Sequence, residues 1–135
     1  MTTQADCIFC RIVAGEIPSK RVYEDDHAIA FLDLDPFKTG HTLVVPRAHV
    51  SDALADADVL ASIAPAIAAT GTLLVEKLGA SGMNVLSNVG EDAGQSVFHL
   101  HVHLVPRYAD DAGMGALLTR AASGDLDAVH ARITG

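Results

Sequence analysis

The sequence predicts an α+β domain in which a largely antiparallel sheet has helices packed to one side. Short runs that alternate or are uniformly apolar, bounded by Gly, Pro or Asp, lie on either side of the middle of the chain and indicate strands. Between them, apolar residues from Ser51 to Leu78 recur at helical spacing. Half of the 135 residues are apolar, which suffices for one domain over residues 1–135 with a single core.

The expected elements follow from these periods. Pro65 interrupts the long helix, so the helix either kinks there or begins near Ser62 with the proline in its first turn. Gly79 is a plausible C-cap. In chain order, we expect helical turns over 7–14, strands over 21–25, 27–33 and 41–46, a helix within 51–78, strands over 83–88 and 96–106, and a weak helix over 125–132.

Net charge limits the partners. The chain carries a net charge of -8, which repels nucleic acid backbones and anionic membranes, so we expect neither as a partner. A small phosphate-bearing ligand stays possible, because backbone N–H groups, hydroxyls and histidines can hold phosphate. The N-terminus lacks the basic and apolar regions of a signal peptide, and the expected location is the cytoplasm.

Three histidines alternate with apolar residues in "FHLHVHLVPR", residues 98–107. In an extended strand His99, His101 and His103 would share one face, with neighbours about 6.5 to 7 Å apart along the strand. Two interpretations remain at this point. The row is either a metal site or a set of nucleophilic and proton-transferring groups with pKa values near neutrality.

The two cysteines form the motif "CIFC" at Cys7 and Cys10. In a reducing compartment this spacing indicates either half of a zinc site or a redox pair. A redox pair usually follows a strand, and the few residues before Cys7 do not provide one. Zinc is therefore favoured, and it requires two more ligands, for which histidines are the best candidates.

The histidine row follows a loop in "NVGEDAGQS", residues 88–96. Its glycines let the backbone approach a ligand, and Gln95, Ser96 and local N–H groups are neutral donors suited to anionic oxygens. A glycine-containing loop alone is often only a turn. Its direct connection to three histidines makes the combination specific.

At this point the chain resembles the histidine triad (HIT) superfamily. "QSVFHLHVHLV" is similar to its motif of three histidines alternating with apolar residues, and "CIFCRIVAGEIPSKRVYEDD", "AFLDLDPFKTGHTLVVPRAHV" and "VLSNVGEDAGQSV" resemble its other blocks in order. The resemblance implies a five-stranded antiparallel sheet per subunit, extended across a homodimer. It also implies hydrolysis or transfer at the α-phosphate of a nucleoside 5'-phosphate derivative.

The resemblance also assigns roles. His101 would be the nucleophile that forms a covalent nucleotidyl-histidine, His103 would donate hydrogen bonds to the phosphate, and Ser96 would interact with the leaving atom. Neutral donors would stabilise the phosphate charge, so no catalytic metal is required. The remaining phosphate contacts are expected from Gln95 and Asn88 through their side chains and from Gly94 and Val97 through their backbones.

The nucleoside would lie upstream of the triad. Asp33 matches the residue whose carboxylate accepts both ribose hydroxyls, although an Asp at a strand end is also a common turn residue. The residues that match the purine-binding positions are Ile8, Phe9, Ile12, Phe31 and Leu34. Each of these apolar side chains, taken alone, is as easily explained by the core.

The Cys-x-x-C branch of the family implies a structural zinc ion, held here by Cys7, Cys10, His49 and His99, and Cys₂His₂ is a common closed zinc site. His41 matches a position that supports the triad, with a plain surface histidine as its alternative. His27 and His130 match nothing and are expected to be solvated.

Several alternatives stay open. The substrate is either a nucleoside phosphoramidate, from which AMP would be released, or a dinucleoside polyphosphate. Arg107 could contact a leaving group or a second phosphate, or be a surface cation. Two further classes are a metalloenzyme with all three triad histidines on one catalytic ion, and a purine-nucleotide-binding regulatory protein with little turnover.

Overall fold

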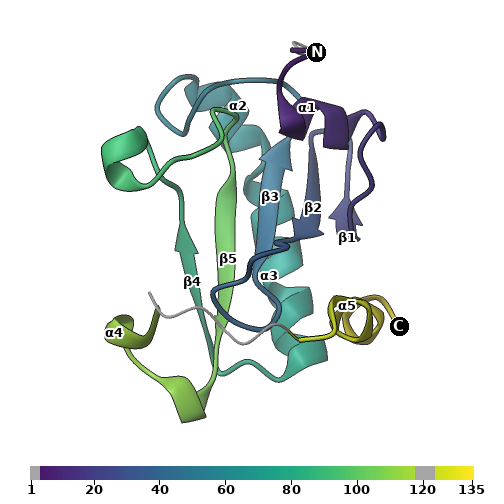
Figure 1. Cartoon of the computed structure of the whole chain (residues 1–135), viewed down its shortest axis with the longest axis vertical. Coiled ribbons are helices and arrows are strands. Elements are labelled where there is room, and N and C mark those ends of the chain that lie inside the picture. The colour runs from purple at the N-terminus through teal and green to yellow at the C-terminus, as the bar shows by residue number, and fades with distance from the viewer. Residues whose placement is uncertain (1–3, 118–123) are drawn as a thin grey trace.

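The computed structural model describes residues 4–117 and 124–135 as one layered α+β fold. All strand pairs of the five-stranded sheet are antiparallel, in the order β1-β2-β3-β5-β4. The strands are β1 (Arg21–Glu24), β2 (Ala28–Leu32), β3 (Thr42–Pro46), β4 (Gly82–Leu86) and β5 (Val102–Arg107) (Figure 1). The predicted α+β class with a five-stranded antiparallel sheet is confirmed, but the helices, expected on one side, cover both faces because each face of the sheet has its own apolar core.

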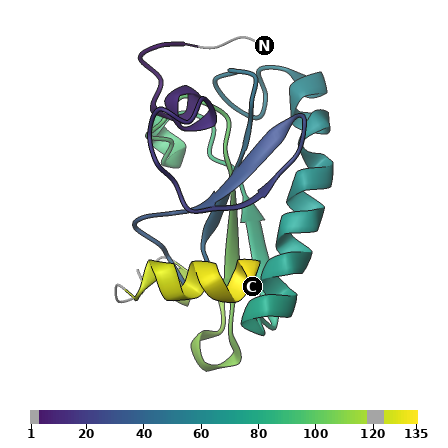
Figure 2. The ribbon, with the colours of Figure 1, turned by 90° about the vertical axis from the view of Figure 1, so that its right-hand side faces the viewer.

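The helices lie on both faces of this sheet. Figure 2 shows α2 (Ala57–Ser62) and α3 (Ala64–Leu78) along one face and α1 (Ile8–Val13) on the other. The C-terminal helix α5 (Leu126–Thr134) crosses below the strands. Two one-turn 3₁₀ helices, η1 (Glu91–Ala93) and η2 (Ala109–Asp111), and the short helix α4 (Met114–Leu117) complete the described chain.

The long predicted helix is divided near Pro65. Helix α2 ends at Ser62, and α3 begins at Ala64 with Pro65 in its first turn, where its missing N–H costs no helical hydrogen bond. This supports the second of the two alternatives, with Ile63 rather than Ser62 at the cap position. Gly79 ends α3 in the left-handed conformation (φ 70°), as expected.

The stretch Ala57–Leu78 is long and apolar enough, by length and composition, to cross a membrane. In this fold it is divided into two helices, and the buried side chains of α3, such as Ala66, Leu74 and Leu78, pack in the core against the sheet. Packing against the sheet therefore explains why these buried side chains of α3 are apolar.

Alternate residues of the central strands enter two different cores. One core lies between the sheet and α3 and includes Val44, Val102 and Leu104. The other lies below α1 and includes Phe31 and Leu43. Because both faces are covered, β2 and β3 are buried at every position.

The fifth strand is shorter than predicted. It begins at Val102, so only His103 of the three histidines lies in the ladder, where it pairs with Leu43 on β3 and Leu86 on β4. His99 and His101 precede the strand. Leu100 N–H donates to the Val50 carbonyl instead of a strand partner. The fourth strand likewise ends at Leu86 rather than at residue 88.

The alternation itself extends beyond the ladder. Leu100, Val102 and Leu104 all pack in the core on the α3 side, while the three histidines are directed to the α1 side. The prediction of a histidine row on one face was therefore right, although most of the row lies outside regular strand structure.

Candidate active site and metal centre

A cavity of about 400 Å³ lies on the α1 side of the sheet, in front of the last two triad histidines. Its lining combines an apolar end and a polar end, as a nucleotide site requires. All five residues expected at the base line it: Ile8, Phe9, Ile12, Phe31 and Leu34. At the polar end are Asp33, Asn88, Gly94, Ser96, Val97, His101 and His103.

Gln95 differs from the other expected phosphate contacts. Its side chain is buried, and its Oε1 accepts a hydrogen bond from Gly90 N–H at 2.8 Å. Its Nε2 donates to the carbonyls of Ser51 (2.7 Å) and Val97 (3.1 Å). The amide thus holds the loop that presents Ser96 and Val97, and it does not belong to the cavity lining.

His101 is held in one orientation by main-chain groups. Its Nδ1–H donates to the His99 carbonyl oxygen at 2.8 Å, which leaves a lone pair on Nε2. Burial lowers the pKa of His101, which favours the neutral ring. Ser87 Oγ donates to the His101 carbonyl oxygen at 2.7 Å and fixes the backbone as well.

A chain of hydrogen bonds assigns the tautomer of His103. The backbone N–H of Phe37 can only donate, so His41 Nδ1 accepts it at 2.9 Å and His41 Nε2 carries the proton. His41 Nε2 lies 2.9 Å from His103 Nδ1 and therefore donates to it. In neutral His103 the proton is then on Nε2.

His41 is fully buried and stacks on Phe37 with ring centroids 5.3 Å apart. It is therefore a supporting group of the triad, and not the surface histidine of the alternative. The imidazole relay from Phe37 N–H through His41 gives the cavity a histidine N–H on His103, and the His99 carbonyl gives it a histidine lone pair on His101.

Asp33 lies beside this relay. Its Oδ1 accepts the N–H of Asp35 at 2.8 Å, and its Oδ2 lies 3.6 Å from His41 Nε2. The ligand atoms of Asp33, His41 and His103 are close enough to hold a cation. Metal binding at His41 Nε2 would nevertheless require an imidazolate, because that nitrogen carries the proton, so the cluster is better described as a hydrogen-bond network.

The second cluster has the donor chemistry of a metal site. Cys7, Cys10, His49 and His99 bring their ligand atoms within 4.8 Å of one another, as the sequence predicted. His99 Nδ1 lies 3.5 Å from Cys7 Sγ, 3.5 Å from Cys10 Sγ and 3.2 Å from His49 Nδ1. Cys10 Sγ lies 3.3 Å from His49 Nδ1.

These separations fit a metal ion with four ligands in tetrahedral coordination. Zn–S bonds of about 2.3 Å and Zn–N bonds of about 2.0 to 2.1 Å place tetrahedral ligands about 3.3 to 3.8 Å apart. His99 Nε2–H donates to the Pro46 carbonyl oxygen at 2.9 Å, so Nδ1 presents its lone pair to the other three ligands. Burial lowers the pKa of His99 to about 4, which keeps the ring neutral and able to bind a cation. These four residues can hold a metal ion.

Phe9 connects the two sites. Its ring packs edge-on against His99 at 5.9 Å, His101 at 5.1 Å and Phe31 at 5.6 Å between centroids.

The triad does not converge on one ion, because His99 is directed to the cysteines and His103 to His41. This geometry disfavours a catalytic ion on all three histidines.

Two residues lie where the sequence did not place them. His130, expected to be solvated, is half-buried and donates from Nε2 to the Arg21 carbonyl oxygen at 2.6 Å. Arg107 binds Asn84 Oδ1 (2.7 Å) and the carbonyls of Asp111 and Gly113, which ties the segment after β5 to β4. It is therefore neither a phosphate contact nor a free surface cation. His27 is exposed, as expected.

Other residues of the site were missed. Ser87 acts through its hydroxyl and Phe37 through its backbone N–H, each by a single hydrogen bond for which the sequence has no signal. The cavity is also lined by Ile17, Pro18, Ser19, Lys20, Leu32, Asp35, Phe37 and Leu43. Only the turn residues at 17–20, which follow the first helix, could have been suspected from their position.

Comparisons with known proteins agree with this geometry. The HIT domain family model matches residues 14–110. "Protein hit" of Bacillus subtilis is 45% identical over 113 residues, which cover 83% of this chain and 78% of that protein. "Adenylylsulfatase HINT3" of Arabidopsis thaliana is 36% identical over 111 residues, covering 82% of this chain and 56% of that protein.

Solved structures give the same result. A hypothetical histidine triad nucleotide-binding protein of Sulfolobus tokodaii has a TM-score of 0.82 at 32% identity, with 95% of this chain and 89% of that chain covered. A Zn-bound histidine triad family protein of Mycobacterium smegmatis has a TM-score of 0.79 at 35% identity, with 96% and 91% covered. By fold, by the triad and by sequence, this chain belongs to the HIT family.

Proposed function

We propose that this protein is a nucleotide hydrolase or transferase acting at the α-phosphate of nucleoside 5'-phosphate derivatives through a nucleotidyl-histidine on His101. The observation that supports this most is the His101 Nδ1–H bond to the His99 carbonyl, which leaves the Nε2 lone pair at the cavity. Two relatives are named for related chemistry, one as nucleotide-binding and one as an adenylylsulfatase.

The proposed reaction has two displacements. His101 Nε2 attacks the α-phosphorus, and the bond from phosphorus to the leaving nitrogen or oxygen breaks. Water then attacks the same phosphorus, which releases the nucleoside monophosphate and restores His101. One proton of that water stays with its oxygen on the phosphate, and the other restores the group that protonated the leaving group in the first step, so the net reaction is hydrolysis.

Neutral donors would stabilise the phosphate charge. His103 Nε2–H, the Asn88 amide, the Ser96 hydroxyl and the backbone of Gly94 and Val97 all belong to the cavity, and preorganised donors of this kind are the main source of stabilisation in phosphoryl transfer. Ser96 is exposed and can reach the leaving atom. Gln95 would act indirectly, by holding the loop.

The nucleoside would occupy the other end of the cavity. The apolar side chains of α1 and Phe31 would enclose the purine, with the exposed Leu34 (80%) at the rim. Asp33 would accept the ribose hydroxyls. Its Oδ1 already accepts one N–H, but a carboxylate oxygen has a second lone pair and Oδ2 remains close to the cavity.

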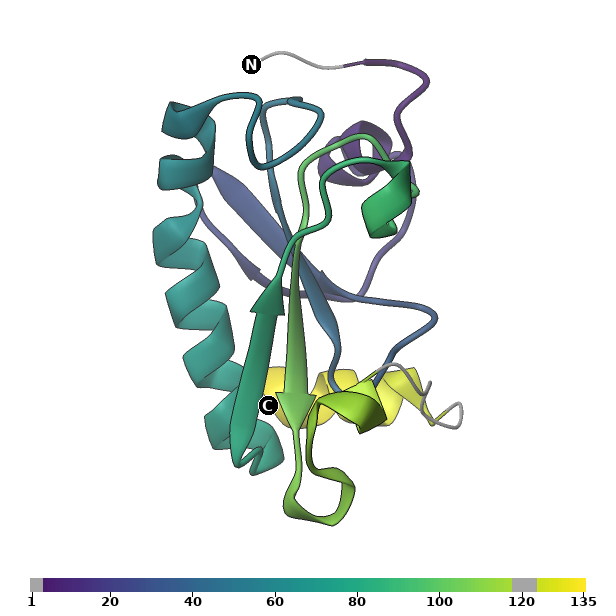
Figure 3. The same ribbon diagram turned by 90° about the vertical axis from the view of Figure 1, so that its left-hand side faces the viewer.

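We further propose that the ion at Cys7, Cys10, His49 and His99 is a structural Zn²⁺, as the donor set and the Zn-bound relative suggest. When bound, it would fix α1 to the segment that carries the triad. The protein would be a cytoplasmic homodimer joined along β4, an edge strand that Figure 3 views directly and whose Val85 is 56% exposed. A monomer in light scattering would contradict the dimer.

Phosphoramidates and dinucleoside polyphosphates differ in their leaving groups. An amine must be protonated as it departs, and His103 Nε2–H or Ser96 could supply that proton. We therefore favour a phosphoramidate, with release of AMP. Dinucleoside polyphosphates are the alternative, because a polyphosphate leaves more readily without protonation.

Nucleoside monophosphate release from adenosine phosphoramidate and from a diadenosine polyphosphate, measured in parallel, tests the proposal. We expect turnover of at least one, and the larger kcat/KM identifies the substrate class. Binding of AMP without turnover of either substrate would contradict the enzyme and favour a nucleotide-binding regulatory protein.

A further inference from the structure

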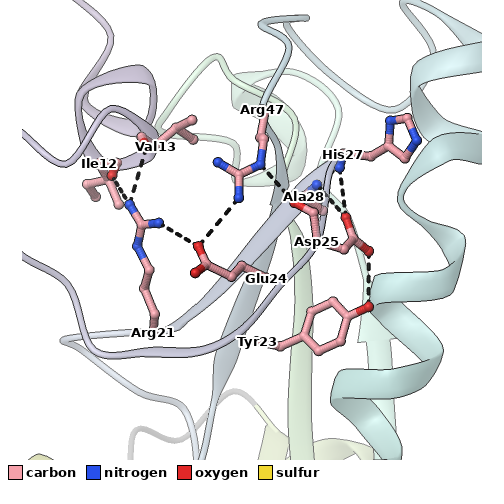
Figure 4. Close-up of polar contacts among 9 residues, drawn as sticks. All are labelled: Ile12, Val13, Arg21, Tyr23, Glu24, Asp25, His27, Ala28 and Arg47. Atoms are coloured by element: carbon pink, nitrogen blue, oxygen red, sulfur yellow. Dashed lines mark hydrogen bonds and ion pairs between the residues drawn. The ribbon is translucent and has the colours of Figure 1, made fainter.

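The C-terminal end of α1 is held by a cluster of charged residues on β1 and just after β3, shown in Figure 4. Arg21 Nη2 donates to the carbonyls of Ile12 (2.6 Å) and Val13 (3.2 Å). Arg21 Nη1 donates to Glu24 Oε2 at 3.0 Å. One guanidinium thus binds two carbonyls at the end of the helix and a carboxylate on its own strand.

The other members of the cluster fix these groups in turn. Arg47 Nη2 lies 3.4 Å from the same Glu24 oxygen, and Arg47 Nε donates to the Asp25 carbonyl at 2.9 Å. The carbonyl of Arg21 itself accepts the bond from His130 on α5. Helix α5 thereby supports the strand that carries the guanidinium.

Helix α1 depends on such external contacts. It has six residues, and helices this short are not stable alone. Of its last carbonyls, that of Ile12 also accepts the N–H of Gly15 at 3.0 Å, so the guanidinium adds to this turn. A cation at this end also interacts favourably with the helix dipole. At the opposite end, Cys7 and Cys10 connect α1 to His49 and His99.

The side chains between these two anchors form one wall of the cavity. Phe9 and Ile12 are buried against the sheet, while Ile8 is 47% exposed at the rim. The triad and the loop over residues 88–97 approach the cavity from other elements and have no contact with the guanidinium among the described hydrogen bonds. Phe9 is the wall residue that also touches the triad, through His99 and His101, whereas the guanidinium holds the wall at the other end of α1.

We propose that Arg21 is a positioning residue for the base-binding wall and determines affinity for the base rather than the rate of phosphoryl transfer. This rests on the proposed function, in which the cavity binds a nucleotide. Lysine cannot replace Arg21 fully, because a single ammonium lacks the planar fork that serves two carbonyls and a carboxylate together.

The test compares a ligand with a base and one without it. Binding of AMP and of ribose 5-phosphate is measured by calorimetry on metal-loaded full-length wild type, Arg21→Ala, Arg21→Lys and Arg11→Ala. Arg11 is the matched control, since it is an exposed cation on α1 itself. Its guanidinium forms an ion pair with Glu16 at 3.7 Å.

We expect Arg21→Ala to weaken AMP binding about tenfold, the effect of losing one charge-assisted hydrogen bond, with ribose 5-phosphate unchanged. KM for a substrate should rise by a similar factor while kcat stays within about twofold, the pattern of lost uniform binding. Arg21→Lys should be intermediate, Arg11→Ala should match wild type, and bound metal should be equal in all four proteins.

Unchanged AMP affinity in Arg21→Ala, or an equal loss for both ligands, would overturn the inference while leaving the proposed function intact. If Arg21→Ala does not fold, Arg21→Lys decides, because its charge is retained and only the fork is lost. Failure of wild type to bind AMP would instead contradict the proposed function, and the inference with it.

Discussion

His99 and His101 are joined by a hydrogen bond from the His101 ring to the His99 main chain, 2.8 Å from Nδ1 to the carbonyl oxygen. The ring of the same His99 lies in the metal centre, 3.5 Å from both cysteine sulfurs. One residue can thus hold an ion through its side chain while its backbone orients the proposed nucleophile. The metal centre and the candidate active site are therefore structurally coupled.

Removal of the metal should lower both stability and activity. The substitution His49→Ala deletes one ligand, and we expect about one metal ion per chain to be lost. An ion present at about 1,000 times its Kd contributes about 4.1 kcal/mol to the free energy of unfolding, so the melting temperature should fall clearly. Metal content and thermal unfolding check this prediction. The exposed His27→Ala is the control, and equal stability of the two variants would contradict a structural ion.

The imidazole relay predicts a defect in His41→Leu. This change removes the donor to His103 Nδ1, so His103 no longer holds its proton on Nε2 alone, and kcat should fall by about 100-fold. Nitrogen-15 NMR of the wild type should show His103 with its proton on Nε2 and His41 likewise. A wild-type His103 protonated on Nδ1 would show that the relay runs in the opposite direction.

Gly94 should not tolerate a side chain. Its φ of 98° is left-handed, and an added Cβ would lie 3.4 Å from Asn88 Nδ2. Gly94→Ala should cost about 1 to 2 kcal/mol in the free energy of unfolding, and it should weaken nucleotide binding because the loop must move. Chemical denaturation and calorimetry measure both effects. Gly71→Ala, in the middle of α3 with open space around it, should instead be neutral or stabilising.

Thr70 offers a stabilising substitution away from the site. Its side chain is fully buried on α3, and among the described residues its Oγ1 has no hydrogen-bond partner. Thr70→Val keeps the shape and removes the unsatisfied hydroxyl, so the free energy of unfolding should rise by about 1 kcal/mol. Urea denaturation checks this value against the exposed Thr72→Val. A loss of stability would indicate that the hydroxyl is satisfied in solution.

The sequence predicted the elements whose periodicity is strong. The apolar runs of β2 and β3, the helical spacing up to Leu78 and the alternation around the triad all appear in the structure. The spacing of the two cysteines indicated half of a metal site, while the resemblance to the family supplied His49 and His99 as the other two ligands. Boundaries were less reliable, since His99 lies in a bend and His101 comes just before the strand, so neither has a ladder partner.

Contacts that depend on one hydrogen bond were not predictable. Gln95 was expected at the phosphate, yet its amide is fully engaged by Gly90, Ser51 and Val97. His130 and Arg107 bind distant backbone carbonyls, a role that any position on the chain can have. Residue type suggests that such a side chain will find a partner, but only the fold decides which one.

The most direct test of the central claim is detection of the covalent intermediate. Wild type and His101→Ala are mixed with excess adenosine phosphoramidate or diadenosine polyphosphate, quenched under conditions that preserve phosphoramidate bonds, digested and analysed by mass spectrometry. The account predicts an adenylyl group on the peptide that contains His101 in the wild type and none in the variant. Rapid turnover by the wild type with no labelled histidine, or turnover that survives in His101→Ala, would contradict it.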